Sequence, residues 1–333
     1  MPSIDRRSLL AGAAATGALA STATLAQSDL VSAPPPDLSG KSILITGCSS
    51  GFGRLGAEYY ARCGAKVFAT MRNTPRPEAE ELIALAERDG LDIIVLRLDV
   101  LYDHEIDDVR TAIDRELGGG QVDVLINNAG IGITSPVEVQ DMEATRLIFE
   151  TNVFGAHRMA RLVLPGMRAR GSGHIIQISS QLGRVIVPHA GHYSATKFAL
   201  EAMSEQMAYE LVPHNVDVTI IEPGGYPTEV WVNRNRYSAE LKERLTGVHA
   251  DGYPRQVESM GREDGSGRSA DPMDVPRAIA RTIAMPPGTR PLRLPVSGGF
   301  IPQTPINELT ARVQTEWLGG SGYGPLIEAV HNV

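Results

Sequence analysis

Cysteine, aromatic residues and positive charge are all scarce in this sequence, and each shortage excludes a class of protein. The 333 residues include 31 Lys and Arg against 39 Asp and Glu, for a formal net charge of −8 at pH 7. A nucleic-acid binder needs clustered Lys and Arg to contact phosphates, and the basic residues here are scattered. Aromatic residues make up 5% of the chain, which leaves few platforms for stacked bases. We therefore expect no nucleic-acid partner.

Cysteine occurs only twice, as Cys48 and Cys63. If Cys48 lies in a loop and Cys63 ends the following helix, the helical rise separates them by roughly 15 Å. A disulfide needs Cα atoms within about 7 Å, so we expect two free thiols, as in a protein that folds in a reducing compartment. The sequence also lacks CxxC and HxxxH patterns, and we expect no metal site.

The first 26 residues have the features of an export signal. Arg6 and Arg7 precede an apolar stretch rich in Ala, Gly and Leu, which ends in a small-x-small tripeptide suited to cleavage. Twin arginines are typical of the bacterial twin-arginine route, so we expect a periplasmic protein with no stable membrane insertion after cleavage. The alternative is an uncleaved anchor at residues 9–26, but Ala, Gly, Ser and Thr dominate where a stable span carries Leu, Ile and Val. A proline-rich linker is expected at residues 27–38.

From Ser42 onward, short β-branched runs alternate with amphipathic stretches. This alternation is typical of a parallel sheet with helices on both faces, and it predicts one α/β domain, residues 39–333, with a doubly wound, seven-stranded sheet. Strands are expected at residues 43–46, 66–70, 93–98, 122–126, 174–178, 216–221 and 292–296. Helices are expected around residues 53–63, 77–89, 102–117, 142–169 and 194–212.

The interval from 224 to 271 breaks this rhythm. It holds Pro, Gly, Tyr and charged residues, with a single candidate helix near residues 239–245. A long irregular insertion in a compact domain is usually a lid or a binding loop, so we expect it to cover the substrate. Five apolar side chains there form either such a lid or ordinary packing: Tyr226, Trp231, Tyr237, Tyr253 and Met260.

The stretch TGCSSGFG, residues 46–53, directly follows the first expected strand. Its glycines and small side chains leave bare backbone N–H groups at a helix N-terminus, where a pyrophosphate gains from the helix dipole and the unpaired donors. The spacing is TGxxxGxG rather than GxGxxG, and by itself it also fits an ordinary strand-to-helix turn. We expect a dinucleotide to contact Gly47, Ser49, Ser50, Gly51, Phe52 and Gly53.

Tyr193 and Lys197 are four residues apart at the start of an expected helix, so both side chains lie on one face. A tyrosine with its ordinary pKa of about 10 is a poor base at neutral pH. A neighbouring ammonium group and a cationic nicotinamide lower that pKa by stabilising the phenolate. With a dinucleotide loop upstream, we interpret the pair as a general acid/base centre rather than as solvated helix residues.

Further motifs follow in a fixed order. They are LDV at 98–100, NNAG at 127–130, TNVFG at 151–155, IIQISS at 175–180, YSATK at 193–197 and EPGGYPT at 222–228. With this set the sequence resembles the short-chain dehydrogenase/reductase family, and VFATMR and TGCSSGFG look like its steroid and retinoid branch. The resemblance implies a Rossmann-like fold and a homodimer or homotetramer built on the helices after TNVFG and YSATK.

The resemblance also implies roles for single residues. Ser180 would hydrogen-bond the substrate oxygen, with Ser179 as its rival, and Asn152 would hold a water against Lys197, unless it only bends a long helix. Lys197 would also hold the nicotinamide ribose. The remaining contacts with the cofactor would come from Asp99, Val100, Asn128, Ala129, Gly130, Tyr193, Pro223, Gly224 and Thr228.

The end of the second expected strand bears on the choice of cofactor. An NAD enzyme of this kind places Asp or Glu there to hold the adenosine ribose 2′-hydroxyl, whereas this sequence has Met71 followed by Arg72. The missing carboxylate and the available guanidinium favour a 2′-phosphate. We expect NADP(H) rather than NAD(H), with the alternative that Arg72 caps a surface turn.

These observations predict an NADP(H)-dependent oxidoreductase that interconverts a secondary alcohol and a ketone or aldehyde, with an apolar small-molecule substrate. The cofactor performs the hydride chemistry, and the protein aligns it. One alternative is a nucleotide-sugar epimerase, which shares YxxxK but usually has a GxxGxxG loop. The other is a non-enzymatic NADP(H)-binding redox sensor, which the filled catalytic positions disfavour.

Overall fold

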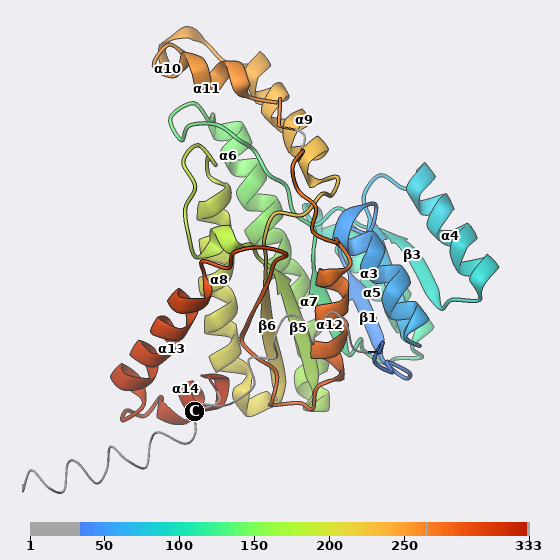
Figure 1. Ribbon diagram of the computed structural model, residues 1–333. Coiled ribbons are helices and arrows are strands. Elements are labelled where there is room, and N and C mark those ends of the chain that lie inside the picture. Colours follow the sequence, from blue (N-terminus) through green and yellow to red (C-terminus); the bar gives the residue numbers. More distant parts are fainter. Residues whose placement is uncertain (1–33, 264, 332–333) are drawn as a thin grey trace, which may run out of the picture.

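The computed structural model describes residues 34–263 and 265–331 (Figure 1). Its core is a seven-stranded, fully parallel sheet in the order β3-β2-β1-β4-β5-β6-β7. The strands are β1 (Ser42–Ile45), β2 (Lys66–Met71), β3 (Ile93–Arg97), β4 (Val124–Asn127), β5 (Gly173–Ile178), β6 (Val216–Pro223) and β7 (Arg293–Val296). The predicted Rossmann-like α/β fold is confirmed, and each expected strand is present with slightly shifted bounds.

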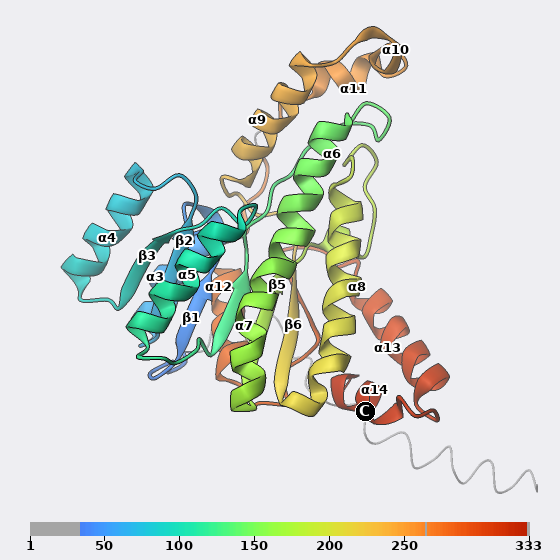
Figure 2. The same cartoon turned by 180° about the vertical axis from the view of Figure 1, so that it is seen from behind.

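Alternating side chains of the strands divide the core into two layers, one on each face of the sheet. Ile43 and Ile45 of β1 pack with helices α3 (Gly51–Arg62), α4 (Pro77–Asp89) and α12 (Asp274–Ala284). Leu44, between them, packs on the opposite face with helices α5 (Asp103–Glu116), α7 (Ala156–Arg170) and α8 (Tyr193–Leu211). Figures 1 and 2 show these two layers from opposite sides. Both faces are covered, so the central strands are mostly apolar, with a few buried polar side chains such as His174 and Gln177.

The helix expected over 142–169 is interrupted. It consists of α6 (Met142–Phe149), a π-helical segment η2 (Glu150–Gly155) and α7. The wider π turn contains Asn152 and places its side chain in the interior, where it is 2% exposed. π-helical bulges inside α-helices are frequent at functional sites.

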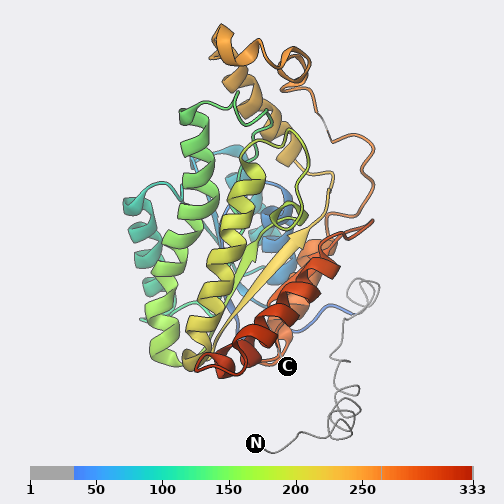
Figure 3. The same ribbon diagram turned by 90° about the vertical axis from the view of Figure 1, so that its left-hand side faces the viewer.

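The insertion at 224–271 is more helical than we expected. It contains α9 (Val230–Glu243), α10 (Gly247–Ala250) and α11 (Pro254–Ser259), which stand beyond the carboxyl ends of the strands (Figure 3). Tyr237 and Leu241 of α9 bury their side chains against Ile133 and Ile148 of the main domain. This tertiary packing stabilises a helix that the mixed composition of the segment conceals.

The C-terminal region adds three helices that the sequence pattern did not indicate: α12, α13 (Thr304–Leu318) and α14 (Gly324–His331). Arg293 of β7 forms ion pairs with Glu201 and Glu205 of α8, at 2.8 and 2.6 Å. Short 3₁₀ segments, η3 (Gln181–Gly183) and η4 (Val212–His214), flank α8.

Cys48 and Cys63 are buried free thiols, as predicted. Within the described part of the chain, no helix is both long and apolar enough to cross a membrane. The expected signal at 1–26 and the linker up to residue 33 lie outside the described residues.

Candidate active site

The site lies where the strand order reverses. β1 is flanked by β2 on one side and by β4 on the other. The connections that follow β1 and β4 therefore run toward opposite edges of the sheet. In doubly wound sheets the crevice at this point, beyond the carboxyl ends of the strands, is the usual ligand site. The glycine loop after β1 and the NNAG segment at the end of β4 both reach it.

The glycine loop is tied directly to the end of β4. The Asn128 Nδ2 donates hydrogen bonds to the backbone carbonyls of Thr46 and Gly47, at 2.9 and 3.0 Å. A Cβ at Gly53 would lie 2.4 Å from the carbonyl oxygen of Gly47, so no larger residue fits there without moving the loop. Ser50 is the N-cap residue of α3, with no side-chain cap. The first N–H groups of α3 therefore face the crevice without a side-chain acceptor.

The other predicted cofactor contacts lie at neighbouring strand ends. Gly51 approaches Thr228, with 3.7 Å between its ideal Cβ position and the Thr228 Cβ, so the loops after β1 and β6 meet. Val100 is buried against Gly155, and its carbonyl accepts a 3.4 Å hydrogen bond from the Arg158 Nη1. The remaining residues follow β1 (Ser49 and Phe52), β3 (Asp99), β4 (Ala129 and Gly130) and β6 (Gly224), or end β6 (Pro223).

Tyr193 and Lys197 lie in the first two turns of α8. The Lys197 Nζ lies 5.7 Å from the centroid of the Tyr193 ring and donates a 2.8 Å hydrogen bond to the carbonyl of Ile178. Burial lowers the pKa of the Lys197 ammonium group to about 8, and the Glu201 carboxylate opposes this shift. The charged form loses its hydration in the interior. Lys197 is therefore still largely cationic at neutral pH.

Ser180, rather than Ser179, is the serine beside Tyr193. Burial raises the pKa of the Tyr193 phenol, while a hydrogen bond with Ser180 and the charge of Arg234 act to lower it. The Ser180 Oγ also accepts a 3.1 Å hydrogen bond from the backbone N–H of Leu182. Ser179 instead packs under Gly183, whose ideal Cβ position lies 2.7 Å from the Ser179 Oγ.

Asn152 is hydrogen-bonded both to the loop after β4 and to α8. Its Oδ1 accepts a hydrogen bond from the N–H of Ile131 at 2.8 Å, and its Nδ2 donates to the carbonyl of Ile131 at 2.9 Å. The Nδ2 also contacts the Thr196 hydroxyl of α8 at 3.1 Å. Asn152 therefore connects the β4 loop to the helix that carries Tyr193 and Lys197, and it lies in the π turn as well. This position is compatible with both predicted roles, a residue that holds a water against Lys197 and a residue that bends the long helix.

Arg72 immediately follows β2, where the sequence places it. Its Nη2 donates a 2.7 Å hydrogen bond to the Tyr237 hydroxyl of α9. Met71, the residue before it, is buried in the core. The end of β2 therefore carries a guanidinium and no carboxylate, and the guanidinium already donates a hydrogen bond to a hydroxyl oxygen.

Two arginines were not indicated by the sequence, and the charge of one of them, Arg234, acts on Tyr193. Arg234 of α9 and Arg268, in the segment after α11, lie over the Trp231 ring. No motif marks them, because the α9 periodicity is hidden in a segment of mixed composition. Among residues 34–263 and 265–331, no group of three or more His, Cys, Asp or Glu side chains is arranged to hold a metal.

Comparison with known proteins identifies the family. Residues 41–238 match the sequence model described as short chain dehydrogenase. The chain is 40% identical over 192 residues to retinol dehydrogenase 8 of Homo sapiens, which covers 57% of this chain and 60% of the human protein. The match thus spans less than two thirds of that relative.

Two solved structures are similar over most of the chain. A short-chain dehydrogenase from Streptomyces avermitilis aligns with a TM-score of 0.65 and 32% identity, covering 84% of this chain and 97% of the other. A gluconate 5-dehydrogenase from Burkholderia cenocepacia J2315, in complex with NADP and tartrate, aligns with a TM-score of 0.61 and 26% identity, covering 79% and 96%. The chain belongs to the short chain dehydrogenase family of oxidoreductases.

Proposed function

We propose that this protein is an NADP(H)-dependent oxidoreductase that interconverts a secondary alcohol and a ketone or aldehyde. One observation carries the proposal: Tyr193, Lys197, Ser180 and Asn152 meet at the carboxyl end of the sheet, beside the glycine loop. The bound cofactor supplies the hydride acceptor or donor. Retinol dehydrogenase 8, a relative by sequence, supports an apolar alcohol as substrate.

In this mechanism the chain's own residues orient the substrate oxygen and transfer the proton. The Ser180 hydroxyl hydrogen-bonds the oxygen and orients it toward Tyr193. The Tyr193 phenol donates a proton to that oxygen in reduction and accepts one in oxidation. The Lys197 ammonium group, held by the Ile178 carbonyl, stabilises the phenolate form. Asn152 positions α8 against the β4 loop through Thr196.

Three features of the crevice support a dinucleotide. The Gly53 position leaves no room for a Cβ beside the Gly47 carbonyl, which suits close approach of a pyrophosphate to the backbone. The uncapped N-terminus of α3 offers donors. Arg72 follows β2 without a carboxylate at its end, which favours the 2′-phosphate of NADP(H) over the 2′-hydroxyl of NAD(H).

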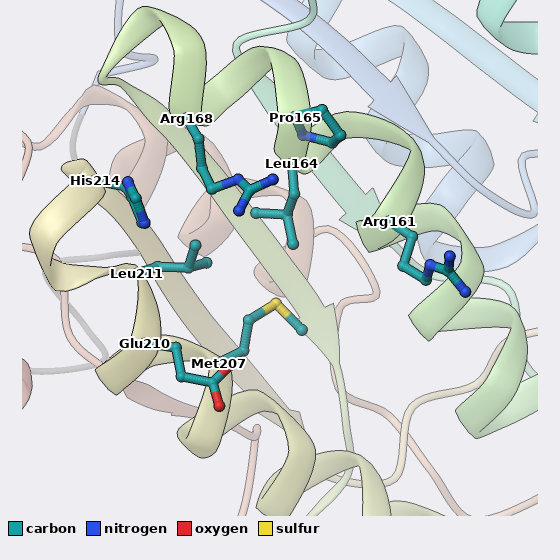
Figure 4. A pocket seen from close by; sticks show the side chains of 8 residues that line it. All are labelled: Arg161, Leu164, Pro165, Arg168, Met207, Glu210, Leu211 and His214. Atoms are coloured by element: carbon teal, nitrogen blue, oxygen red, sulfur yellow. The ribbon is translucent and has the colours of Figure 1, made fainter.

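A groove between α7 and α8 supports self-association. Figure 4 shows the residues that line it, and its volume is about 400 Å³. The residues of α8 that line it are near the C-terminal end of that helix, whereas Tyr193 begins the helix. The lining of the groove combines apolar and charged side chains: Arg161, Leu164, Pro165, Arg168, Met207, Glu210, Leu211 and His214. We infer that a homodimer or homotetramer packs through these helices.

We also infer that the twin-arginine signal expected at residues 1–26 directs the protein to the periplasm.

The test is a turnover screen of ketones and secondary alcohols with NADPH and NADP⁺, repeated with Tyr193→Phe. The variant keeps the ring and removes the proton donor, so turnover falls at least about 100-fold while NADPH binding, measured by fluorescence, is retained. Tyr323→Phe, at an exposed position, is the matched control and keeps full activity. Retained activity in Tyr193→Phe overturns the assignment. Epimerisation without net change in NADPH favours the sugar epimerase instead.

A further inference from the structure

Two guanidinium groups share one indole ring at the edge of the site. The Arg234 Cζ lies 4.4 Å and the Arg268 Cζ 3.6 Å from the centroid of the Trp231 ring. The Trp231 Nε1 donates a 2.7 Å hydrogen bond to the carbonyl of Tyr226, which fixes the ring to the segment after β6. The indole therefore acts as a rigid platform on which both arginines are held.

Arg234 faces the catalytic centre. It precedes Tyr237 and Leu241 on the same face of α9, and both of those side chains belong to the apolar cluster that includes Tyr193. Its aliphatic stem lies against Gly132, with 3.1 Å between the Arg234 Cδ and the ideal Cβ position of that glycine. The charge of Arg234 is close enough to lower the pKa of Tyr193.

The Arg234 guanidinium is desolvated and incompletely bonded. Its side chain is 19% exposed, and among the residues that the structure describes its buried Nε has no hydrogen-bond partner. A buried donor without an acceptor is costly. A ligand that brings an acceptor to this position removes that cost.

Arg268 and Arg234 together form an arginine cluster on the Trp231 ring, and Arg268 lies on the side of the turn after β6. Its Nε lies 3.0 Å from the ideal Cβ position of Gly225, in the turn after β6. The ion pairs of Arg234 and Arg268 within the described ranges are both made to the carboxylate of Glu263. Two guanidiniums share one carboxylate, so the cluster keeps one positive charge, and Glu263 shows that a carboxylate fits between them.

We propose that Arg234 and Arg268 bind an anionic group of the substrate, most simply a carboxylate. The substrate is then a hydroxy acid or oxo acid whose apolar body packs on the Tyr193 cluster, with its carbinol or carbonyl carbon at Tyr193. Arginine holds carboxylates through paired N–H groups, and the desolvated Nε of Arg234 gains the acceptor it lacks. This inference rests on the proposed oxidoreductase function and narrows its substrate class.

The first experiment measures binding without turnover. The chain has two tryptophans, and Trp317 is 73% exposed on α13, so Trp317→Phe leaves Trp231 as the only indole. The NADP⁺-bound Trp317→Phe protein, which has no hydride to give to a ketone, is titrated with 4-oxopentanoate and with its neutral methyl ester, and with longer oxo acids and their esters. We expect the acids to change Trp231 fluorescence and to bind at least about tenfold more tightly than the esters.

The second experiment compares variants on the same ligand pairs. Arg234→Met keeps the aliphatic stem and reduces the acid-to-ester ratio of affinities, and of kcat/KM, at least about tenfold, whereas Arg234→Lys retains part of the preference. Arg236→Met is the matched control, because Arg236 is on the same helix with a 52% exposed side chain that pairs with Glu240. We expect it to keep the wild-type ratio.

Each outcome bears on one proposal. Equal binding of acids and esters in the Trp317→Phe protein, or an unchanged ratio in Arg234→Met, overturns the anionic-substrate inference. A weaker affinity for NADPH in Arg234→Met and Arg268→Met with no change in the ratio overturns it too, because the arginines then serve a cofactor phosphate. Selective binding of acids without turnover of any alcohol or ketone supports the anion site and contradicts the oxidoreductase mechanism.

Discussion

Arg72 shows how one side chain at the end of a strand bears on the choice between two nearly identical cofactors. Its guanidinium donates a 2.7 Å hydrogen bond to Tyr237, which holds it beside the predicted position of the adenosine ribose. A phosphate on that ribose gains a charge-assisted hydrogen bond, whereas a hydroxyl gains a weaker one.

Replacement of Arg72 by Ala tests this role. We expect the Kd of NADPH to rise about 10- to 100-fold and that of NADH to change little, as measured by fluorescence titration. Tyr237→Phe is the control, because it removes the hydrogen bond from Arg72 to α9 and keeps the guanidinium. Equal losses for both cofactors in Arg72→Ala would show that the arginine acts on the local structure instead.

At the scale of elements, the contact between β6 and α13 buries a carboxyl group. Glu222 has no exposed surface; its Oε2 accepts a 2.7 Å hydrogen bond from Asn307 of α13. Burial and the nearby Glu201 of α8 raise the pKa of Glu222, although Arg293 and Arg184 oppose this. The folded protein therefore holds the Glu222 proton at pH values where the unfolded chain has released it.

Stability should consequently fall with pH because of this group. The loss begins above the ordinary glutamate value of 4.5 and continues until the pH passes the raised pKa of the folded state. Glu222→Gln cannot ionise, so its melting temperature relative to wild type should be higher at pH 8 than at pH 5. Glu308→Gln, at an exposed position of α13, is the control. Differential scanning fluorimetry across this range decides the question, and parallel curves for wild type and Glu222→Gln contradict it.

The elements also show which sequence signals are sufficient. Short apolar runs such as residues 43–45 predicted the strands because a doubly covered sheet requires apolar side chains on both faces. The π turn at Glu150–Gly155 could not be predicted, because it depends on Asn152 bonding to Ile131, a residue 21 positions away. The helix α9 was missed for a similar reason: its buried face packs on distant residues, and intrinsic propensity does not report such contacts.

At the scale of the whole molecule, the expected signal and the cofactor site make a joint prediction. The twin-arginine route carries folded proteins, and free nicotinamide cofactor outside the cytoplasm would be scarce. We expect the cofactor to be bound before export and to dissociate slowly, with the α9–α11 segment restricting its exit. Protein purified from the periplasm should contain nearly one NADP(H) per chain, measured by absorbance and enzymatic assay after denaturation.

The control for export is the double variant Arg6→Lys with Arg7→Lys, which leaves the folded domain unchanged and should keep the protein in the cytoplasm. Immunoblots of fractionated cells follow its location. An unchanged distribution removes the export interpretation. Periplasmic protein without nucleotide refutes the carried cofactor while leaving the enzymatic assignment untouched.

The sequence by itself determined the family, the alternation of strands and helices along the chain, and the positions of Tyr193, Lys197 and the glycine loop. These features depend on local spacing and on the apolar character of buried strands. The tertiary structure decided which side chains meet. It brought Ser180 rather than Ser179 to Tyr193, and it placed Arg234 and Arg268 on one indole. Such contacts join residues far apart in the chain, and their energies arise from burial and charge in a shared crevice that no local pattern encodes.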